Sequence, residues 1–421
     1  MSFETISVVG LGYIGLPTAA MFASRKKKVI GVDVNQHAVE TINRGEIHIV
    51  EPDLDMIVHA AVTEGYLKAV STPEPADAFL IAVPTPFKEC AGGEIPEPDL
   101  RFIEAASKAI APVLKKGDIV ILESTSPVGA TEQMAEWLAE ARSDLTFPQM
   151  VGENADVNIA HCPERVLPGH VVRELVENDR VIGGLTKKCS ERSVELYKTF
   201  VQGECVITNA RTAEMVKLTE NSCRDVQIAF ANELSMICDE LNINVWELIS
   251  LANRHPRINI LQPGPGVGGH CIAVDPWFIV SKTPEQAKLI YQARKVNDSK
   301  PKWVIDKVKI AISDFLQEHP SRTANSITIA CYGLAFKANI DDLRESPALM
   351  ISKEIVKLHQ GQTFLVEPNI SSIPVDIDAS LISISKAIDE ADIHVMLVDH
   401  EEFKDQKPEN AIVVDTKGIW L

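Results

Sequence analysis

The residues best suited to chemistry lie in a loop over residues 262–276, which reads Gln-Pro-Gly-Pro-Gly-Val-Gly-Gly-His-Cys-Ile-Ala-Val-Asp-Pro. Four glycines and three prolines among fifteen residues exclude a helix or a central strand, because proline lacks an amide hydrogen and glycine weakens regular structure. The loop carries Cys271 directly after His270 and four residues before Asp275. Most cysteines are small buried hydrophobic residues, but a thiol among glycines and polar groups is typical of a nucleophile. The loop also lacks the Lys-Ser/Thr ending of a phosphate-binding P-loop.

A second set of polar residues lies on a predicted helix over residues 212–241, a stretch without glycine or proline. Lys217, Asn221 and Arg224 follow one another at spacings of four and three, so they share one face of that helix. This face is either part of a site or an ordinary solvated surface, and the pattern alone does not decide. Residues 253–257 read Asn-Arg-His-Pro-Arg, a basic turn that could hold an anionic ligand of this subunit or of a neighbouring one.

The N-terminal segment predicts an element that holds a dinucleotide. A strand over residues 5–9 runs into Gly10-Leu-Gly-Tyr-Ile-Gly15, a helical pattern covers residues 16–25, and a second strand over residues 28–32 ends in Asp33. The Gly-x-Gly-x-x-Gly motif alone is weak evidence. The complete order of strand, glycine motif, helix, strand and acid is a strong dinucleotide-binding fingerprint.

The glycines and the acid each have an expected role. Gly10 makes the tight turn, Gly12 lets a pyrophosphate approach the backbone, and Gly15 lets the helix pack closely on the strand. The helix N-terminus then faces the phosphates. Asp33 would accept hydrogen bonds from the adenine ribose and repel a 2′-phosphate, so the expected cofactor is NAD rather than NADP.

Two further strands of the same sheet, over residues 78–83 and 118–122, end in turns rich in hydroxyl groups. Ligands of such sheets bind beyond the carboxyl ends of the strands. Thr85 and Thr125 are therefore candidates to contact the nicotinamide end of the cofactor, and Thr131 is a weaker one. Turn and helix-cap hydroxyls are an equally good explanation on spacing alone.

The end of the first third repeats this arrangement. A strand over residues 157–161 runs into a turn, Cys162-Pro-Glu-Arg-Val-Leu-Pro-Gly169. Residues 180–184, Arg-Val-Ile-Gly-Gly, are expected to form the last strand of this domain. A second long helical stretch, from residue 284 to about residue 317, is expected to be interrupted near Lys300-Pro301, because proline breaks helices.

The last third predicts a second doubly wound parallel sheet, because strands again alternate with helices. Its strands are expected at residues 326–332, 363–366, 393–398 and 411–414. The turns near the strand ends carry Lys337, Arg344 and Lys417. Three cations there would suit a nucleoside diphosphate, although each one singly is more often plain surface.

Composition restricts the class of protein further. The chain has 421 residues and a formal net charge of −18, which argues against a nucleic-acid partner or an anionic membrane. No apolar run approaches the roughly 20 residues of a membrane span. The eight cysteines are scattered without a Cys-x-x-Cys pair, so we expect no metal site and a reducing, cytoplasmic location. The N-terminus runs directly into a strand pattern, so we also expect no leader peptide.

Taken together, these motifs resemble the nucleotide-sugar 6-dehydrogenases, which oxidise a UDP-sugar to a UDP-uronic acid with two NAD. The resemblance covers the whole chain. Its motifs are Gly10–Gly15, Val83–Pro86, Ser124-Thr125, Cys162–Glu164, Lys217 with Asn221, Gly268–Cys271 with Asp275, Ala335–Lys337 and Arg344–Ser346.

Two departures from the usual pattern point to one branch of the family. UDP-glucose dehydrogenases usually have Asn-Pro-Glu-Phe-Leu where this chain has Cys162-Pro-Glu-Arg-Val166, and Arg254-His-Pro-Arg257 precedes the cysteine loop. Both are similar to the bacterial branch that acts on N-acetylated sugars. The implied substrate is UDP-N-acetyl-D-mannosamine, for surface polysaccharide synthesis, and the alternatives are UDP-N-acetylglucosamine and UDP-glucose.

The resemblance also implies a mechanism. The alcohol at carbon six becomes an aldehyde, Cys271 captures it as a thiohemiacetal, a second oxidation gives a thioester, and water releases the carboxylate. Lys217 and Asn221 would stabilise the oxyanion, and Lys217 would also move the alcohol's proton. Asp275, Glu164 and Thr125 are unranked candidates to handle the hydrolytic water.

The full site expected from the resemblance has two binding sets. The cofactor set is Gly10, Gly12, Tyr13, Ile14, Gly15, Asp33, Thr85, Thr125 and Thr131. The substrate set is Arg165, Val166, Lys217, Asn221, Arg224, His255, Arg257, Gly268, Phe336, Lys337, Arg344 and Lys417.

The expected fold is α/β, with two doubly wound Rossmann-like parallel-sheet domains joined by a central helical dimerisation domain. The domains are residues 1–205 for NAD, residues 206–318 with the cysteine loop and the dimer interface, and residues 319–421 for the UDP-sugar. The resemblance implies a homodimer, or a tetramer, in which Arg257 reaches the partner's site. Two alternatives are another NAD enzyme with the same first domain, such as a 3-hydroxyacyl or 6-phosphogluconate dehydrogenase, and a non-catalytic binder of nucleotide sugars. Neither needs the cysteine loop.

Overall fold

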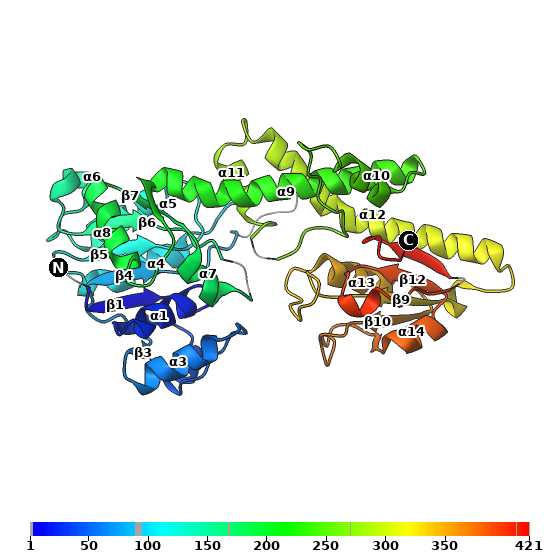
Figure 1. The fold of residues 1–421 in the computed structure, drawn as a ribbon, viewed down its shortest axis with the longest axis horizontal. Helices are drawn as coiled ribbons and strands as arrows, with labels where there is room; N and C mark the ends of the chain where they lie inside the picture. The colour runs from blue at the N-terminus through cyan, green and yellow to red at the C-terminus, as the bar shows by residue number, and fades with distance from the viewer. Residues whose placement is uncertain (1–2, 89–94, 167–168, 270, 410, 421) are drawn as a thin grey trace. The chain divides into compact units, whose positions relative to one another are not determined.

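The structure is a computed structural model that describes residues 3–88, 95–166, 169–269, 271–409 and 411–420. The chain divides into two compact units. The first consists of residues 1–220 with 277–283, and the second of residues 221–276 with 284–421. Each unit contains one sheet with helices packed against it (Figure 1).

The first sheet has eight strands, in the spatial order β3-β2-β1-β4-β5-β6-β7-β8. Neighbouring strands are parallel except β6 and β7, which are antiparallel. The order reverses between β1 and β4, and ligands of such sheets bind beyond the strand ends at this point. The strands are β1 Thr5–Val9, β2 Lys28–Val32, β3 Leu67–Val70, β4 Ala78–Ile81, β5 Ile119–Leu122, β6 Asn158–His161, β7 Arg180–Gly184 and β8 Cys205–Asn209.

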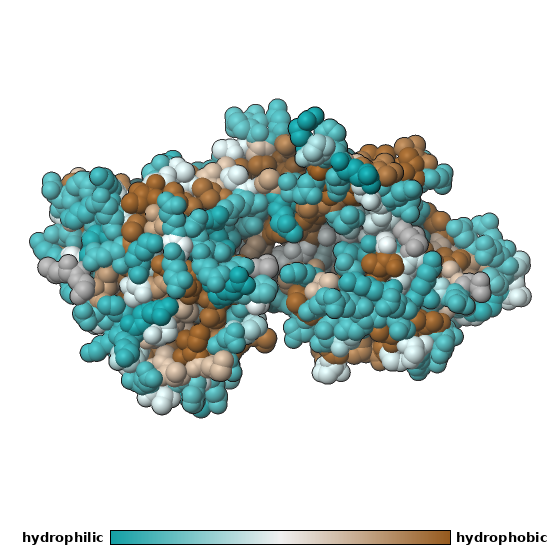
Figure 2. Space-filling view, viewed as in Figure 1, coloured by the Kyte–Doolittle hydropathy of each residue, from teal (hydrophilic) through white to brown (hydrophobic). Residues whose placement is uncertain are grey.

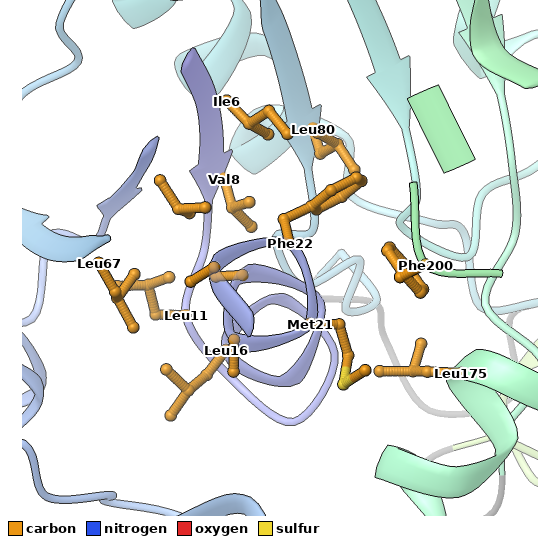
Figure 3. Packing of buried hydrophobic residues seen from close by; sticks show 14 of the residues in the cluster. Ile6, Val8, Leu11, Leu16, Met21, Phe22, Leu67, Leu80, Leu175 and Phe200 are labelled. Carbon is orange, nitrogen blue, oxygen red and sulfur yellow. The ribbon is translucent and has the colours of Figure 1, made fainter. Parts of the chain in front are cut away.

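Both faces of this sheet are buried, because successive side chains of a strand point to opposite faces. On β5, Ile119 and Ile121 enter one apolar cluster, and Val120 and Leu122 enter the other. Figure 3 shows the first cluster around α1, whose Phe22 points toward the strands. The helices of this unit are α1 Gly15–Ser24, α2 Gln36–Asn43, α3 Leu54–Thr63, α4 Arg101–Ile110, α5 Ala130–Ala141, α6 Pro148–Val151, α7 Val171–Glu177 and α8 Lys187–Tyr197, with the short 3-10 helices η1 Ala111–Val113 and η2 Gly152–Asn154.

The expectation that residues 180–184 form the last strand of the first domain is wrong. Strand β8 follows and pairs in parallel with β7, with Val206 opposite Val181. Its apolar residues Val206 and Ile207 are largely exposed, so β8 is an edge strand with no buried apolar run. Strand β3, which was not predicted, is also short, and it alternates between buried and exposed positions.

The second unit contains a five-stranded parallel sheet in the order β11-β10-β9-β12-β13. The order again reverses next to the first strand, so the prediction of a second doubly wound sheet is confirmed. Its strands are β9 Thr328–Tyr332, β10 Gln362–Val366, β11 Ser380–Leu381, β12 Ile393–Met396 and β13 Ile412–Asp415. Its helices are α10 Val245–Ala252, α12 Lys288–Glu318, α13 Pro347–Leu358 and α14 Ile384–Glu390, with η3 Ala324–Ser326 and η4 Glu401–Phe403. Helices α9 Ala210–Glu240 and α11 Asp275–Lys282 each have residues in both units.

The predicted interruption near Lys300-Pro301 is wrong, because α12 runs through Pro301 as one helix. Proline removes one backbone hydrogen bond of the helix. The side chains of Asn297 and Lys300 are buried and hydrogen-bonded to α9. These contacts hold the helix before Pro301, and Lys307, which donates to Asp239 of α9 at 2.9 Å, holds it after Pro301.

Candidate active site

The glycine motif between β1 and α1 has the geometry that its sequence requires. Gly10 has a φ of +90°, and its amide donates to the carbonyl of Val32 at 2.8 Å. A Cβ on Gly10 would lie 2.6 Å from the carbonyl oxygen of Ala82, and one on Gly15 would lie 1.7 Å from that of Gly10. A Cβ on Gly12 would meet nothing within 4 Å. The tight turn and the close helix packing are therefore present, and Gly12 leaves open space over the helix N-terminus.

Asp33 lies at the end of β2 with its carboxylate held in place. Its Oδ2 accepts from the amide of Leu11 at 2.8 Å, and its Oδ1 accepts from the amide of Asn35 at 2.8 Å. The side chain is half-buried, so the carboxylate remains accessible to a ribose. Tyr13, in the glycine motif, is exposed, and Ile14 is half-buried. This cradle fits the phosphates and adenosine of NAD.

The turns after β4 and β5 lie side by side, next to the point between β1 and β4 where the strand order reverses. The hydroxyl of Thr85 donates to the carbonyl of Thr125 at 2.6 Å, and that of Ser124 donates to the carbonyl of Val83 at 2.7 Å. Two of the predicted cofactor residues, Thr85 and Thr125, are thus brought together.

Thr131 has a different environment, because it is fully buried at the start of α5. Its hydroxyl and its amide donate to Oε1 of Glu214 at 2.6 and 2.8 Å. The amide of Gly129 donates to the other oxygen of Glu214 at 2.7 Å. The carboxylate of Glu214 therefore caps α5 and ties α9 to it, and Thr131 is part of that attachment.

The turn after β6 carries a buried ion pair that sequence reasoning missed. Oε2 of Glu164 accepts from Nη1 of Arg180 at 2.6 Å, and its Oε1 accepts from the amide of Arg165 at 2.7 Å. The guanidinium of Arg165 pairs with Glu220. Val166, the next residue, is half-buried against the apolar cluster around α1. The only signal of Arg180 in the sequence is a cation at the start of an apolar strand.

A second buried carboxyl lies close to this pair. The hydroxyl of Tyr197 donates to Oε1 of Glu123 at 2.6 Å. Burial raises the pKa of Glu123 to about 7, although the nearby Arg180 opposes the shift. Burial likewise raises the pKa of Cys162, again against the charge of Arg180, to about 12. Cys162 therefore stays a thiol and is a structural cysteine.

In the second unit, the cysteine loop is joined to α9 through Asp275. The amide of Asn221 donates to Oδ2 of Asp275 at 2.5 Å. The backbone amide of Asp275 in turn donates to the carbonyl of Cys271 at 2.9 Å. Cys271 is exposed and Asp275 is buried. Three of the predicted catalytic residues are therefore brought together, and Lys217 lies one turn before Asn221 on α9.

The same loop packs against the segment that follows β9. A Cβ on Gly268 would lie 2.6 Å from the carbonyl oxygen of Glu345 and 3.0 Å from Cβ of Phe336. Gly264 lies beside Lys417, whose Nζ would be 3.7 Å from a Cβ there. The structure thus places the predicted substrate residues Gly268, Phe336 and Lys417 around one loop.

The remaining predicted substrate residues are more exposed. Lys337 and Arg224 are exposed, and the guanidinium of Arg344 pairs with Asp342 at 2.6 Å. Arg257 and His255 lie together on the exposed turn after α10, where the amide of Arg257 donates to Nδ1 of His255 at 3.4 Å. His270, the neighbour of Cys271, lies outside the described residues.

Two buried residues that sequence reasoning missed stabilise the turn that carries Phe336 through hydrogen bonds. Glu367, at the end of β10, accepts from the amides of Leu334 and Ala335 at 2.7 and 3.1 Å. Nε2 of His400 lies 3.0 Å from Oε2 of Glu367. These hydrogen bonds hold the pKa of Glu367 below its ordinary value, against the raising effect of burial. The available signal was an acid at the end of the second strand, where Asp33 lies in the first unit.

Across the described part of the chain, the structure contains no helix long and apolar enough to cross a membrane. The same residues include no cluster of three or more His, Cys, Asp or Glu side chains that could hold a metal ion.

Three family models match most of the chain, and all describe the UDP-glucose/GDP-mannose dehydrogenase family. Its NAD binding domain matches residues 4–201, its central domain residues 211–299, and its UDP binding domain residues 330–421. A UDP-N-acetyl-D-mannosamine dehydrogenase of Yersinia pestis is 68% identical, over 100% of both chains. An NDP-N-acetyl-D-galactosaminuronic acid dehydrogenase of Ralstonia solanacearum is 62% identical, over 100% of this chain and 97% of that protein.

A solved structure, that of a UDP-N-acetyl-mannosamine dehydrogenase from Staphylococcus aureus, has the same fold. It is 42% identical, with a TM-score of 0.82, and the match covers 99% of this chain and 95% of that chain.

The glycine cradle, the strand-end acid and the cysteine loop beside a second sheet define an NAD-dependent dehydrogenase. The chain belongs to the UDP-glucose/GDP-mannose dehydrogenase family, and it is an NAD-dependent UDP-sugar dehydrogenase. The predictions of the enzyme class, of NAD and of a UDP-sugar substrate are confirmed. The roles of the individual residues and the three domain boundaries stay predictions.

Proposed function

We propose that this enzyme oxidises carbon six of UDP-N-acetyl-D-mannosamine twice, to give UDP-N-acetyl-D-mannosaminuronate for a bacterial surface polysaccharide. One observation carries the proposal. The exposed Cys271 is held beside a hydrogen-bonded pair, Asn221 and Asp275. A four-electron oxidation needs a covalent intermediate of this kind, because a free aldehyde would otherwise escape between the two oxidations. The substrate assignment is supported by the relatives from Yersinia pestis and Staphylococcus aureus.

NAD, when bound to the cradle of Gly10, Gly12 and Gly15, accepts one hydride in each of the two oxidations. Asp33 binds the adenine ribose through the oxygen lone pairs that its two backbone contacts leave available. Tyr13, Ile14, Thr85, Thr125 and Thr131 complete the proposed cofactor set.

In the first oxidation, Lys217 takes the proton of the carbon-six hydroxyl. After this oxidation, the sulfur of Cys271 bonds to the aldehyde carbon and its thiol proton is released to water, while Lys217 returns its proton to the carbonyl oxygen to complete the thiohemiacetal hydroxyl. Asn221 donates to the same oxygen while it is negative. The hydrogen bond from Asn221 to Asp275 fixes the amide in place for this role.

In the second oxidation, the thiohemiacetal loses its hydroxyl proton and a hydride and becomes a thioester. Water then attacks the thioester carbon, the carbon–sulfur bond breaks, and the thiol of Cys271 is restored as the carboxylate leaves. Asp275, Glu164 and Thr125 are the proposed residues that orient this water or take its proton.

The anionic and sugar parts of the substrate would contact a wider set of residues. Cations can hold the diphosphate through charge-assisted hydrogen bonds. The proposed substrate set is Arg165, Val166, Lys217, Asn221, Arg224, His255, Arg257, Gly268, Phe336, Lys337, Arg344 and Lys417.

We also propose a homodimer, or a tetramer built from it, in which Arg257 reaches the partner's site. Large apolar side chains of α9, of the residue after it and of α10 are about half exposed or more: Phe230, Ile237, Leu241 and Leu251. Figure 2 shows an apolar patch in the region of α10. Exposed apolar patches of this kind mark protein interfaces. The seven cysteines that the structure describes are free, which supports a reducing compartment such as the cytoplasm.

The experiment that tests the function compares Cys271→Ser with Cys223→Ser, since Cys223 is also an exposed cysteine. With UDP-N-acetyl-D-mannosamine and NAD, we expect Cys271→Ser to lose uronate formation by a factor of about 1,000 or more, and Cys223→Ser to retain it. Mass spectrometry of quenched wild-type turnovers should find the sugar on the peptide that contains Cys271. Uronate formation at the wild-type rate by Cys271→Ser would contradict the nucleophile.

The substrate is tested by NADH formation across a panel of UDP-sugars. The panel contains N-acetylmannosamine, N-acetylglucosamine, N-acetylgalactosamine and glucose, because the Ralstonia relative is named for a galactosamine derivative. We expect kcat/KM to be highest for the mannosamine compound. A higher value for any other member would replace the proposed substrate while leaving the chemistry unchanged.

A further inference from the structure

Helix α9 has an unusual polar face in the second unit. Asn221, Asp225, Asn232 and Ser235 follow one another at spacings of four, seven and three, so they lie within roughly 80° of one another around the helix axis. Asp225 and Asn232 are fully buried, and Ser235 is buried as well. Buried faces of helices are normally apolar, because each buried polar group must find a partner or cost free energy.

The partners of this face come from α12. Nη1 of Arg294 lies 2.6 Å from Oδ1 of Asp225, and Nδ2 of Asn297 donates to the same oxygen at 2.8 Å. Nδ2 of Asn232 donates to Oδ1 of Asn297 at 2.9 Å. The polar seam therefore runs without a break from Arg294 to Asn232. Apolar side chains of similar volume are often at least as stabilising as a buried ion pair. We therefore interpret the Asp225–Arg294 pair as fixing one arrangement of the two helices.

The seam ends on the backbone of the cysteine loop. The amide of Gly264, which is buried, donates to Oδ1 of Asn232 at 2.9 Å. At the other end of the loop, Asp275 accepts from Asn221 at 2.5 Å. Asn221 and Asn232 are about three turns apart on one face of α9, roughly 16 Å along its axis. One helix face thus holds both ends of the segment that carries Cys271.

We propose that Asn232 is a positioning residue for Cys271, acting through the amide of Gly264 and itself held by Asn297 and the Asp225–Arg294 pair. This inference rests on the proposed function of Cys271. A sulfur must reach the aldehyde carbon within a few tenths of an ångström of the best geometry, and a misplacement of about 1 Å can cost roughly 100-fold in rate. The first oxidation forms no bond to sulfur, so it does not depend on this placement.

Loss of the anchor therefore has a specific consequence. Substrate still loses one hydride and one proton to give the aldehyde, with one NAD reduced, but capture by Cys271 becomes slow. The aldehyde then leaves the enzyme before the second oxidation, so that the second NAD is not reduced and no carboxylate forms. The ratio of NADH to uronate, which is two for complete turnover, rises as aldehyde escapes.

The test uses Asn232→Ala, with Ser235→Ala as the matched control on the same helix face. Ser235 contacts Lys300 on α12, and its change leaves the hydrogen bond from Gly264 to Asn232 intact. Hydroxylamine traps released aldehyde as an oxime, and iodoacetamide measures the reactivity of Cys271. We expect Asn232→Ala to lower uronate formation about 10- to 100-fold, to release trapped aldehyde, and to change the alkylation rate of Cys271. Ser235→Ala should keep the wild-type ratio of NADH to uronate.

A second variant covers the case in which Asn232→Ala does not fold. Asn232→Gln keeps an amide oxygen that can accept from Gly264 and an amide nitrogen that can donate to Asn297, so its NADH-to-uronate ratio should stay close to that of the wild type. Aldehyde release from Asn232→Gln as large as expected for Asn232→Ala would overturn the inference. So would a proportional loss of NADH and uronate in Asn232→Ala, since that marks a purely structural role.

The two proposals fail separately. If Cys271→Ser makes uronate at the wild-type rate, the nucleophile itself is wrong. If Cys271→Ser is inactive while Asn232→Ala keeps the wild-type rate and ratio, only the positioning role is wrong.

Discussion

At the scale of single residues, both sheets have a glycine turn after the first strand that is hydrogen-bonded to an acid at the end of the next strand. The two acids have different environments and therefore different expected roles. Gly10 and Gly333 have φ values of +90° and +87°, and in each case the following amide donates to the acid at the end of the next strand, Asp33 or Glu367. Asp33 is half-buried and can reach a ligand. Glu367 is buried against His400, so it supports the turn after β9 and its lone pairs are already used.

Because of this difference, we expect Asp33 to be the residue that distinguishes NAD from NADP. Asp33→Asn removes the charge that repels a 2′-phosphate and weakens the acceptor for the ribose hydroxyls. A hydrogen bond to a charged group contributes about 1.5–3 kcal/mol, so we expect the Kd for NAD to rise about 10- to 100-fold and the preference over NADP to shrink. Titration calorimetry with both cofactors measures this, with the exposed Glu40→Gln as the control. Unchanged affinities for both would show that Asp33 does not contact the ribose.

Residues whose role is local could be predicted from the sequence, and residues whose role is tertiary could not. Gly10 and Gly15 were predictable because their neighbours in the chain already demand a turn and close packing. Arg180 and Glu367 were not, because their partners are 16 and 33 residues away. Such pairs leave no periodic pattern, and each looks like an ordinary charged residue at a strand end.

At the scale of elements, hydrophobic periodicity predicted the strands and helices that have a buried face. The predictions failed for an exposed edge strand and for a helix that tertiary contacts hold together. Strand β8 is an exposed edge, so its apolar residues carry no signal of burial. Helix α12 contains Pro301, and local propensity alone would break it there. Its contacts with α9 hold it together, and they include the hydrogen bond from Lys300 to Ser235. The Nζ of Lys300 also lies 3.7 Å from the ring centroid of Trp303, on α12 itself.

Lys300 makes the stability of the second unit depend on pH. Burial lowers the pKa of Lys300 from 10.5 to about 7, and only Asp239 opposes the shift. The unfolded chain therefore binds more protons than the folded one between pH 7 and 10.5, so stability should rise with pH across this window. Lys300→Met removes the cost of burying the charge. We expect the variant to be more stable than the wild type by roughly 1–3 kcal/mol at pH 7, with the difference shrinking toward pH 10.

Thermal unfolding at several pH values measures this effect, and Lys309→Met is the control because Lys309 is exposed on the same helix. The control should change the unfolding temperature little at any pH. A Lys300→Met variant that is less stable than the wild type at pH 7, or a difference independent of pH, would show that the ammonium is adequately solvated in the folded state.

At the scale of the whole molecule, the fold class followed from the alternation of strands and helices. The boundaries did not follow as simply. The predicted divisions after residues 205 and 318 stay predictions, whereas the two compact units divide within α9, after residue 220. A long helix that contributes to two cores has no change of period where the cores divide. Assembly is harder still to predict, because an interface face and a core face of a helix are both apolar.

The proposed dimer can be tested by mixing two inactive variants. Cys271→Ser keeps Arg257, and Arg257→Ala keeps Cys271, so neither homodimer has a complete site if Arg257 serves the partner's site. Random exchange between the two makes half of the dimers mixed, and in each of these one of two sites is complete. We therefore expect about one quarter of the wild-type activity per site after exchange.

The activity of the mixture shows whether Arg257 serves the partner's site or its own subunit's site. If Arg257 served its own subunit, no dimer in the mixture would have a complete site. Activity after exchange would then stay at the level of the separate variants. The control is Phe230→Glu placed in both chains, which puts a charge on the exposed apolar face of α9. If that face is the interface, sedimentation should show monomers, and the same mixture should regain no activity, since no partner then supplies Arg257.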